Sequence, residues 1–218
     1  MKKFDDYCFM SIGSNCAPIL FLGPNRLRGP VDNIIIKDAY VLKFLVEGTY
    51  FSYIINKKNY TKEKPKYLCR QNDPKFWTIY PYLCILHNDP ESIQYREELT
   101  KRLITFNSFL QQVKTNPNYY FTFCLNEWIV DTKTHLLKTK TLYYVCEYLK
   151  SINLLSKVIF VQLHSDDISH GGYCNCYIKD IYKWKEKYNL KVIDLYSKDK
   201  IDGEELYQQF KTKVLEVI

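Results

Sequence analysis

Residues 157–163 read KVIFVQL, a run of apolar and β-branched residues that predicts a strand buried on both faces. Three further runs have the same character: residues 7–12 (YCFMSI), 119–125 (YYFTFCL) and 191–195 (KVIDL). In each run the apolar residues follow one another more than they alternate with polar ones. This is typical of a parallel sheet covered by helices on both sides, so we predict four buried parallel strands.

Helical patterns lie between these runs. The longest covers residues 91–114, where Leu99, Leu103 and Phe106 recur every three or four positions and Pro90 gives a start signal. Shorter helical patterns cover residues 38–47, 138–150, 178–188 and 203–217. The alternation predicts a three-layer α/β fold, with a mostly parallel sheet of about four to five strands flanked by helices. We expect one domain over residues 1–218, with an irregular inserted region at about 48–86 that holds a short extra strand or a loop.

The charge and hydropathy of the chain argue against a nucleic-acid partner and against a membrane span. The chain of 218 residues carries a formal net charge of +7, and its lysines are spread along the sequence without a continuous basic stripe. We therefore expect no nucleic-acid partner. No run approaches the roughly 20 apolar residues of a membrane span, and Asp5 and Asp6 interrupt the stretch where a signal peptide would continue its apolar core. These features predict a cytoplasmic protein.

The cysteines and glycines indicate the redox state of the thiols and exclude two kinds of phosphate-binding loop. Of eight cysteines, Cys8, Cys124 and Cys146 lie inside apolar strand or helix patterns, which is typical of reduced thiols in a core. The seven glycines form neither GxGxxG nor GxxxxGK[ST], so we expect no phosphate-binding loop of these types.

Chemistry in an open parallel sheet gathers beyond the carboxyl ends of the strands. The segment after the first strand is residues 11–18 (SIGSNCAP); Asn126 follows the second strand, His164 the third and Tyr196 the fourth. Because the carboxyl ends of parallel strands share one edge, these residues are candidates for one site.

Cys16 is the most informative of these candidates. Gly13 permits a tight turn after the strand, and Ser14 and Asn15 are good helix N-caps, which places Cys16 near a helix N-terminus. Backbone N–H groups and the helix dipole there stabilise a thiolate, and the same N–H groups suit an oxyanion hole. We assign Ser14, Asn15 and Asn126 to oxyanion or substrate binding. A structural N-cap followed by a small buried residue is the alternative.

The residues around Cys16 resemble a known family. SIGSNCAPILFL, followed by RLRGPVDN at residues 26–33, is similar to the opening of an uncharacterised bacterial family labelled papain-like cysteine peptidases. That family opens with Ser-Leu-Gly-x-x-Cys and continues with Pro-Phe-Asp-Trp. Here Pro30 and Asp32 remain, while Val31 and Asn33 replace the Phe and the Trp. The resemblance covers roughly the first half of the chain and the strand at 157–163.

The family pattern continues with a His before an arginine-bearing helix, which here resembles His87 and Arg102. The resemblance implies Cys16 as nucleophile, His87 as its base, Asp32 or Asp89 as the orienting carboxylate, and Arg102 as a substrate-binding residue. His164 is the rival base, because the strand rule puts it on the same edge as Cys16. The resemblance supports His87 and the geometry supports His164; we favour His87.

Two further comparisons bear on the fold and on metals. A cysteine directly after the first strand is similar to the nucleophile loop of SGNH-type esterases, so we predict a Rossmann-like or SGNH-like sheet and not the true papain fold. His164, His170, Cys174 and Cys176 crowd into one glycine-containing loop, but Cys-x-Cys is tighter than the usual spacing of zinc ligands. We assign no metal.

The leading hypothesis is a cysteine-dependent acyl-transfer enzyme that hydrolyses or transfers an acyl group of a small-molecule, peptide or glycan substrate without a cofactor. The alternative is a surface-polysaccharide biosynthesis protein, either an acyltransferase or a glycan-binding protein, in which Cys16 is structural. Coenzyme A is the cofactor to expect in that case, and the 20 tyrosines would supply a carbohydrate-facing surface.

Overall fold

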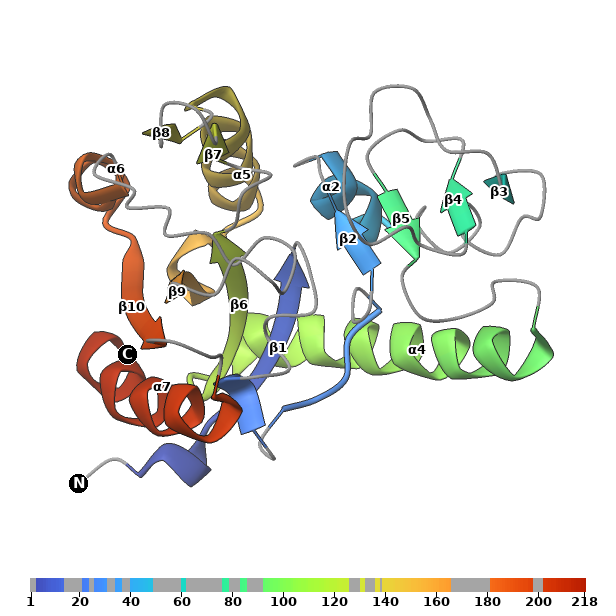
Figure 1. Cartoon of the computed structure of the whole chain (residues 1–218), viewed down its shortest axis with the longest axis horizontal. Coiled ribbons are helices and arrows are strands. Elements are labelled where there is room, and N and C mark those ends of the chain that lie inside the picture. The colour runs from blue at the N-terminus through green and yellow to red at the C-terminus, as the bar shows by residue number, and fades with distance from the viewer. Residues whose placement is uncertain are drawn as a thin grey trace.

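The computed structural model describes residues 3–13, 21–23, 26–30, 34–36, 40–48, 60–61, 76–78, 83–85, 92–125, 130–131, 136–137, 139–165, 181–197 and 202–218. These residues form an α/β fold around a four-stranded parallel sheet (Figure 1).

The parallel sheet contains the four predicted strands. They are β1 (Cys8–Gly13), β6 (Tyr119–Leu125), β9 (Val158–Ser165) and β10 (Lys191–Ser197), arranged in the order β1-β6-β9-β10. Every neighbouring pair is parallel. Because the spatial order follows the order along the chain, each crossover moves the chain to the adjacent position, and all four carboxyl ends lie on one edge.

The predicted helices are confirmed as well. They are α2 (Tyr40–Val46), α4 (Ile93–Thr115), α5 (Thr139–Ser151), α6 (Ile181–Tyr188) and α7 (Gly203–Val217), with short 3-10 turns η1 (Phe4–Asp6) and η4 (Leu155–Lys157). Helix α4 begins two residues later than the sequence suggests, because the Ser92 side chain accepts the N–H of Tyr95 and acts as the N-cap. Asp202 caps α7 in the same way through the N–H groups of Glu204 and Glu205.

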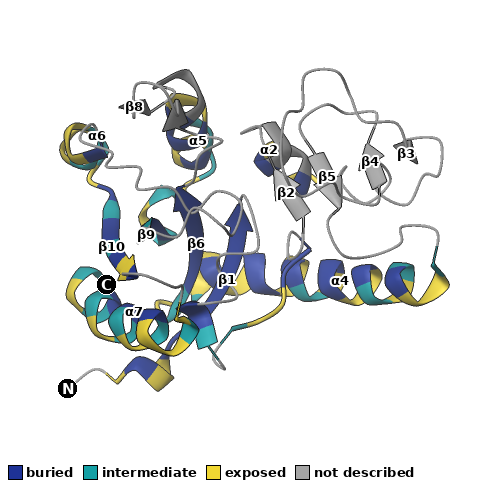
Figure 2. Ribbon diagram, in the orientation of Figure 1, coloured by how far each residue is buried: buried dark blue, intermediate teal, exposed yellow. Residues whose placement is uncertain are grey.

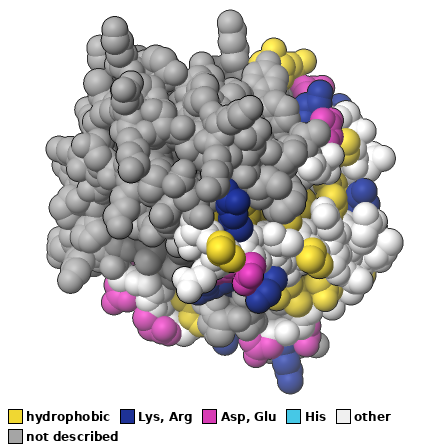
Figure 3. All heavy atoms as spheres, turned by 90° about the vertical axis from the view of Figure 1, so that its right-hand side faces the viewer, with side chains coloured by type: hydrophobic (Ala, Val, Ile, Leu, Met, Phe, Trp, Pro, Cys, Tyr) yellow, Lys and Arg dark blue, Asp and Glu magenta, His cyan; other side chains and the backbone are white. Residues whose placement is uncertain are grey.

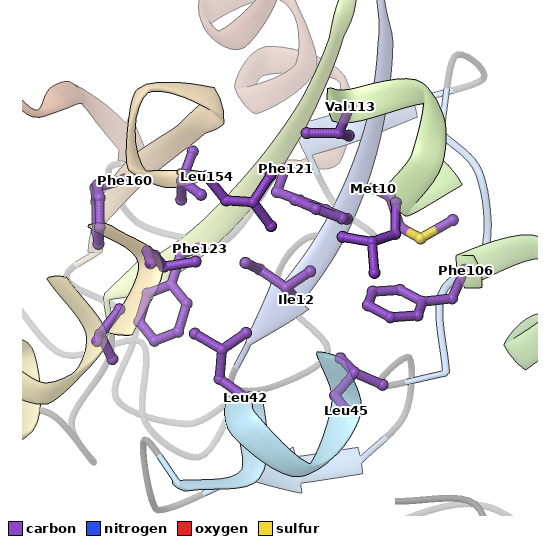
Figure 4. Packing of buried hydrophobic residues seen from close by; sticks show 14 of the residues in the cluster. Met10, Ile12, Leu42, Leu45, Phe106, Val113, Phe121, Phe123, Leu154 and Phe160 are labelled. Carbon is purple, nitrogen blue, oxygen red and sulfur yellow. The ribbon is translucent and has the colours of Figure 1, made fainter. Parts of the chain in front are cut away.

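Each face of the parallel sheet has its own core. On one face, Met10, Ile12, Phe121 and Phe160 pack among buried residues of α2, α4 and α5, such as Phe106 (Figure 4). On the other face, strand residues pack among buried residues of η1 and α7. Figure 2 shows β1 and β6 almost wholly buried and β10 with intermediate and exposed residues, while α4 and α7 alternate buried and exposed residues. Burial of alternate residues on opposite faces explains why the strands read as continuous apolar runs.

The region at 48–86 holds more strand than the sequence indicates. Its strands β3 (Tyr60–Thr61), β4 (Phe76–Thr78) and β5 (Leu83–Ile85) form a second, antiparallel sheet with β2 (Ile34–Ile36), which precedes the region, in the order β2-β5-β4-β3. A two-stranded pair, β7 (Val130–Asp131) with β8 (Leu136–Leu137), lies between β6 and α5 in the chain. Strands of two or three residues are too short to show a period of two in the sequence, so the analysis of periodicity misses them.

The described residues show whether any helix could span a membrane and whether the cysteines are paired. None of the helices in these ranges is both long and apolar enough to cross a bilayer. Cys8, Cys124 and Cys146 are reduced thiols, as the sequence predicts. Burial raises the pKa of both the Cys124 and the Cys146 thiol to about 12.

Candidate functional site

A histidine and an aspartate meet at the carboxyl half of β9 and β10. The His164 Nε2 atom lies 2.9 Å from Oδ1 of Asp194, and the Tyr182 hydroxyl donates to Oδ2 of the same carboxylate at 3.0 Å. The parallel register sets this contact: His164 lies opposite Tyr196, so Asp194, two residues earlier, lies on the same face of the sheet. The His164 side chain is only 11% exposed, so the pair is largely shielded from water.

Tyr196 and Lys213 complete the surroundings of this pair. The Tyr196 ring stacks on the His164 imidazole, with centroids 4.6 Å apart and planes 11° apart. Lys213, on α7, donates through Nζ to the backbone oxygen of Asp194 at 2.5 Å and lies 5.0 Å from the centre of the Tyr196 ring. The imidazole is therefore held by a carboxylate at one nitrogen and by an aromatic ring across its plane.

The charge of Asp194 determines which nitrogen of the His164 imidazole carries the shared hydrogen. Burial alone would raise the pKa of Asp194, but hydrogen bonds from His164 and Tyr182, with the nearby charge of Lys213, bring that pKa below its ordinary value. Asp194 is thus ionised at neutral pH and accepts hydrogen bonds only. Nε2 of His164 therefore carries the hydrogen that Asp194 accepts, and in the neutral imidazole the lone pair that can act as a base is on Nδ1.

An open groove of about 680 Å³ runs along the outer edge of β10, beside the pair. Lys185 of α6 and residues of β10 and α7 line it, including Asp194 and Tyr196. Within it, the Gln209 side chain accepts the Tyr196 N–H at 2.9 Å and donates to the Tyr196 carbonyl at 2.7 Å. The amide of Gln209 thus takes the place of a neighbouring strand and covers an edge that would otherwise present unpaired backbone groups.

Most of the predicted site residues lie outside the described residues. These are Cys16, Ser14, Asn15, Asp32, His87, Asp89 and Asn126. Their roles stay predictions. The structure does place Gly13 at the carboxyl end of β1, with β6 alone between β1 and β9.

Arg102 lies on α4 with its guanidinium buried. It forms an ion pair and hydrogen bond with Glu98, one helical turn earlier, and Glu98 also bonds Arg28 at 3.2 Å. The hydrogen bond from Arg102 is the main reason why the pKa of Glu98 is lowered. Figure 3 shows the molecule from the right-hand side of Figure 1, and there acidic and basic side chains are intermixed among the described residues. The predicted substrate-binding role of Arg102 stays a prediction.

Two residues around His164 were not predicted from the sequence. They are Asp194, which contacts the His164 ring, and Tyr182, which contacts the Asp194 carboxylate. Tyr196 was named only as a residue at the end of its strand. One signal was present: Asp194 is a single carboxylate inside the apolar run KVIDL, and a charge within a buried strand needs a partner. The identity of that partner, 30 residues away, depends on strand register, which the sequence alone does not show.

The described residues hold no group of three or more His, Cys, Asp and Glu side chains arranged to bind a metal ion. In the cysteine-rich loop, His170, Cys174 and Cys176 lie outside the described residues.

Comparisons of the chain with models of protein families, with curated proteins and with solved structures find no match. The resemblance to papain-like peptidases therefore stays a prediction from the residues that carry it.

Proposed function

We propose that this protein is a cysteine-dependent acyl-transfer enzyme in which Cys16 is the nucleophile and His164, oriented by Asp194, is the general base. The contact between His164 and Asp194 carries the proposal, because it pairs a base with the carboxylate that fixes its tautomer. Nucleophile, base and orienting group form the set that activated cysteines and serines share.

The strand order supports His164 as the partner of Cys16. Strands β1 and β9 lie on either side of β6, so their backbones are separated by about 10 Å. Cys16 follows Gly13 by three residues, a length of chain that reaches up to about 10 Å. The register places Gly13 level with Phe160, four residues before His164, so the path to His164 runs about 13 Å along the strands as well as about 10 Å across them. The proposal therefore requires an extended chain from Gly13 to Cys16, with the two side chains spanning the remaining distance to Nδ1 of His164. The observed contact of His164 with Asp194 leads us to propose His164 as the base, while His87 lies outside the described residues.

The proposed reaction proceeds through a thioester. Nδ1 of His164 takes the proton of the Cys16 thiol, and the sulfur attacks the acyl carbon of the donor to form a C–S bond. Backbone N–H groups near Ser14 and Asn15 stabilise the oxyanion. The leaving group departs with the proton returned from His164. Water or an acceptor then attacks the thioester, again with His164 as base, which releases the acid or the acylated product and restores the thiol.

Asp194 has an electrostatic role throughout. It stays ionised, keeps the hydrogen on Nε2 and stabilises the imidazolium that forms when Nδ1 takes the proton. Tyr182 holds the second oxygen of the carboxylate and so fixes its orientation. The substrate class is a peptide, amide, ester or thioester, and the site of action is the cytoplasm, to which the three reduced thiols are suited.

Acyl-enzyme trapping tests this function. The full chain is incubated with p-nitrophenyl acetate and with a peptide thioester, quenched in acid, and mapped by peptide mass. We expect an acyl group on Cys16 in the wild type and in Cys8→Ala, the matched control in β1, and none in Cys16→Ala. Acylation or turnover that survives unchanged in Cys16→Ala would refute the proposal.

A further inference from the structure

Three aromatic rings from α5 and α6 lie against one another. Trp184 and Tyr188 lie one turn apart on α6, with ring centroids 5.3 Å apart and planes 5° apart. Tyr143 of α5 meets Trp184 edge to face, at 6.4 Å and 67°. The stacked pair on α6 thus forms one wall, and Tyr143 of α5 forms a second, steeply inclined wall. We call these three residues the aromatic cage.

A positive charge already occupies the cage. The Lys187 ammonium nitrogen lies 4.9 Å from the centre of the Tyr188 ring, 5.2 Å from that of Trp184 and 5.9 Å from that of Tyr143. All three distances fall within the range of about 6 Å over which a ring face attracts a cation. The side chain of Lys187 therefore shows that the cage accepts an ammonium group.

A carboxylate lies close to the same rings. Glu147 follows Tyr143 by one turn of α5, and burial together with the charge of Glu147 raises the pKa of Tyr188. Negative ring faces and a nearby carboxylate all favour a cation. The cage also opens to solvent, because the Tyr143 side chain is 44% exposed.

The chemistry of the ring faces selects among cations. A lysine ammonium is compact and strongly hydrated, so it gives up favourable water contacts when it packs on aromatic rings. A quaternary ammonium has no N–H groups to desolvate, and aromatic cages are its common recognition site in proteins. We propose that Tyr143, Trp184 and Tyr188 bind a quaternary ammonium group of a ligand, and that Lys187 fills the cage when the ligand is absent.

This site is independent of the acyl-transfer function. The alternative is that Lys187 has a purely structural role. In that case it holds α6 against α5, and no ligand takes its place. The two differ in a measurable way. A structural lysine leaves no binding site when it is removed, whereas a placeholder leaves a vacant site of higher affinity.

The proposal is tested by the binding of tetramethylammonium chloride to the full chain. Ligand-observed NMR measures this binding, and sodium chloride at equal ionic strength is the reference. We expect saturable binding in the wild type and binding about 5- to 30-fold tighter in Lys187→Ala, because about 1–2 kcal/mol of cation–π attraction no longer competes. Lys150→Ala, which removes an exposed lysine at the end of α5, should bind as the wild type does. Circular dichroism establishes that each variant is folded.

A second pair of variants tests the rings. Tyr143→Leu in the Lys187→Ala background should abolish the binding, whereas Tyr144→Leu, at the neighbouring exposed position, should retain it. Free choline compared with phosphatidylcholine vesicles then distinguishes a soluble ligand from a lipid headgroup, and binding of either supports the cage. Absence of saturable binding in Lys187→Ala, or equal binding with and without the Tyr143 ring, would overturn the proposal.

Discussion

His164 and Asp194 lie 30 residues apart in the chain, on neighbouring parallel strands, and their side chains meet at 2.9 Å. The contact fixes the imidazole in one tautomer and leaves Nδ1 as the basic nitrogen. The contact lies toward the carboxyl edge of the parallel sheet. Strand β1 ends at the same edge, three residues before Cys16 in the chain. The relationship between these two side chains therefore links the fold to the proposed chemistry.

Asp194→Asn should weaken the base. An asparagine amide cannot stabilise an imidazolium, and its N–H group can hold the wrong tautomer of His164. We expect the rate of Cys16 alkylation near neutral pH to fall by about tenfold or more, since a positioned base contributes about 10²–10⁴-fold. Mass mapping of iodoacetamide adducts measures this rate. Tyr182→Phe, which removes one hydrogen bond to the same carboxylate, should have a smaller effect; an unchanged rate in Asp194→Asn argues against the pair.

Gln209→Ala should uncover the edge of β10. The Tyr196 N–H and carbonyl both lose their partner, which costs about 1–2 kcal/mol in the free energy of unfolding. The exposed edge also favours pairing between molecules. Urea unfolding and size-exclusion chromatography measure the two effects. Gln208→Ala is the matched control, since its amide bonds only the exposed Glu204 of its own helix, and it should change stability by less than about 0.5 kcal/mol.

Acid should destabilise the protein in part through Glu98. The pKa of Glu98 in the folded protein lies below its ordinary value, mainly because of Arg102. The stabilising contribution is therefore complete above the unfolded pKa of about 4.3, and it is lost as the pH falls through the lower folded value. Urea unfolding between about pH 6 and 3 should show a shallower decline in Glu98→Gln than in the wild type. Glu97→Gln, at the adjacent exposed position, should follow the wild type, and parallel curves for all three proteins would contradict the assignment.

Phe106→Ala should remove much of the stability of the larger core. Phe106 is fully buried and packs on Phe121 with ring centroids 5.8 Å apart. Truncation of a buried phenylalanine costs about 3–5 kcal/mol, a large share of the total for a domain of this size. Thermal and urea unfolding measure the loss. Ile104→Ala, two residues away on the exposed side of α4, should be nearly neutral.

The sequence predicts the central layer of the fold well because each strand and helix carries its own local signal. The run at 119–125 coincides with β6, and the pattern at 203–217 coincides with α7. The antiparallel sheet was missed because strands such as Tyr60–Thr61 are too short for a period to appear.

The candidate site was predictable only in part. The rule that ligands lie beyond strand ends selects His164, which is a statement about one position along one strand. Its contact with Asp194 depends on the register between two strands, and register follows from packing over the whole sheet. The aromatic cage is likewise non-local, because Tyr143 and Trp184 belong to different helices. No periodicity in the sequence pairs them.

The most direct test of the account is the pH dependence of Cys16 alkylation by iodoacetamide from about pH 5 to 9, measured in the wild type, His164→Ala and His87→Ala. Cys124 and Cys146, whose buried thiols have pKa values raised to about 12, serve as unreactive internal standards. We expect Cys16 to react well below the ordinary thiol pKa of about 8.5 in the wild type and in His87→Ala, and His164→Ala to lose this reactivity. Reaction of Cys16 only at or above that pH in the wild type, or an unchanged profile in His164→Ala, would contradict this expectation.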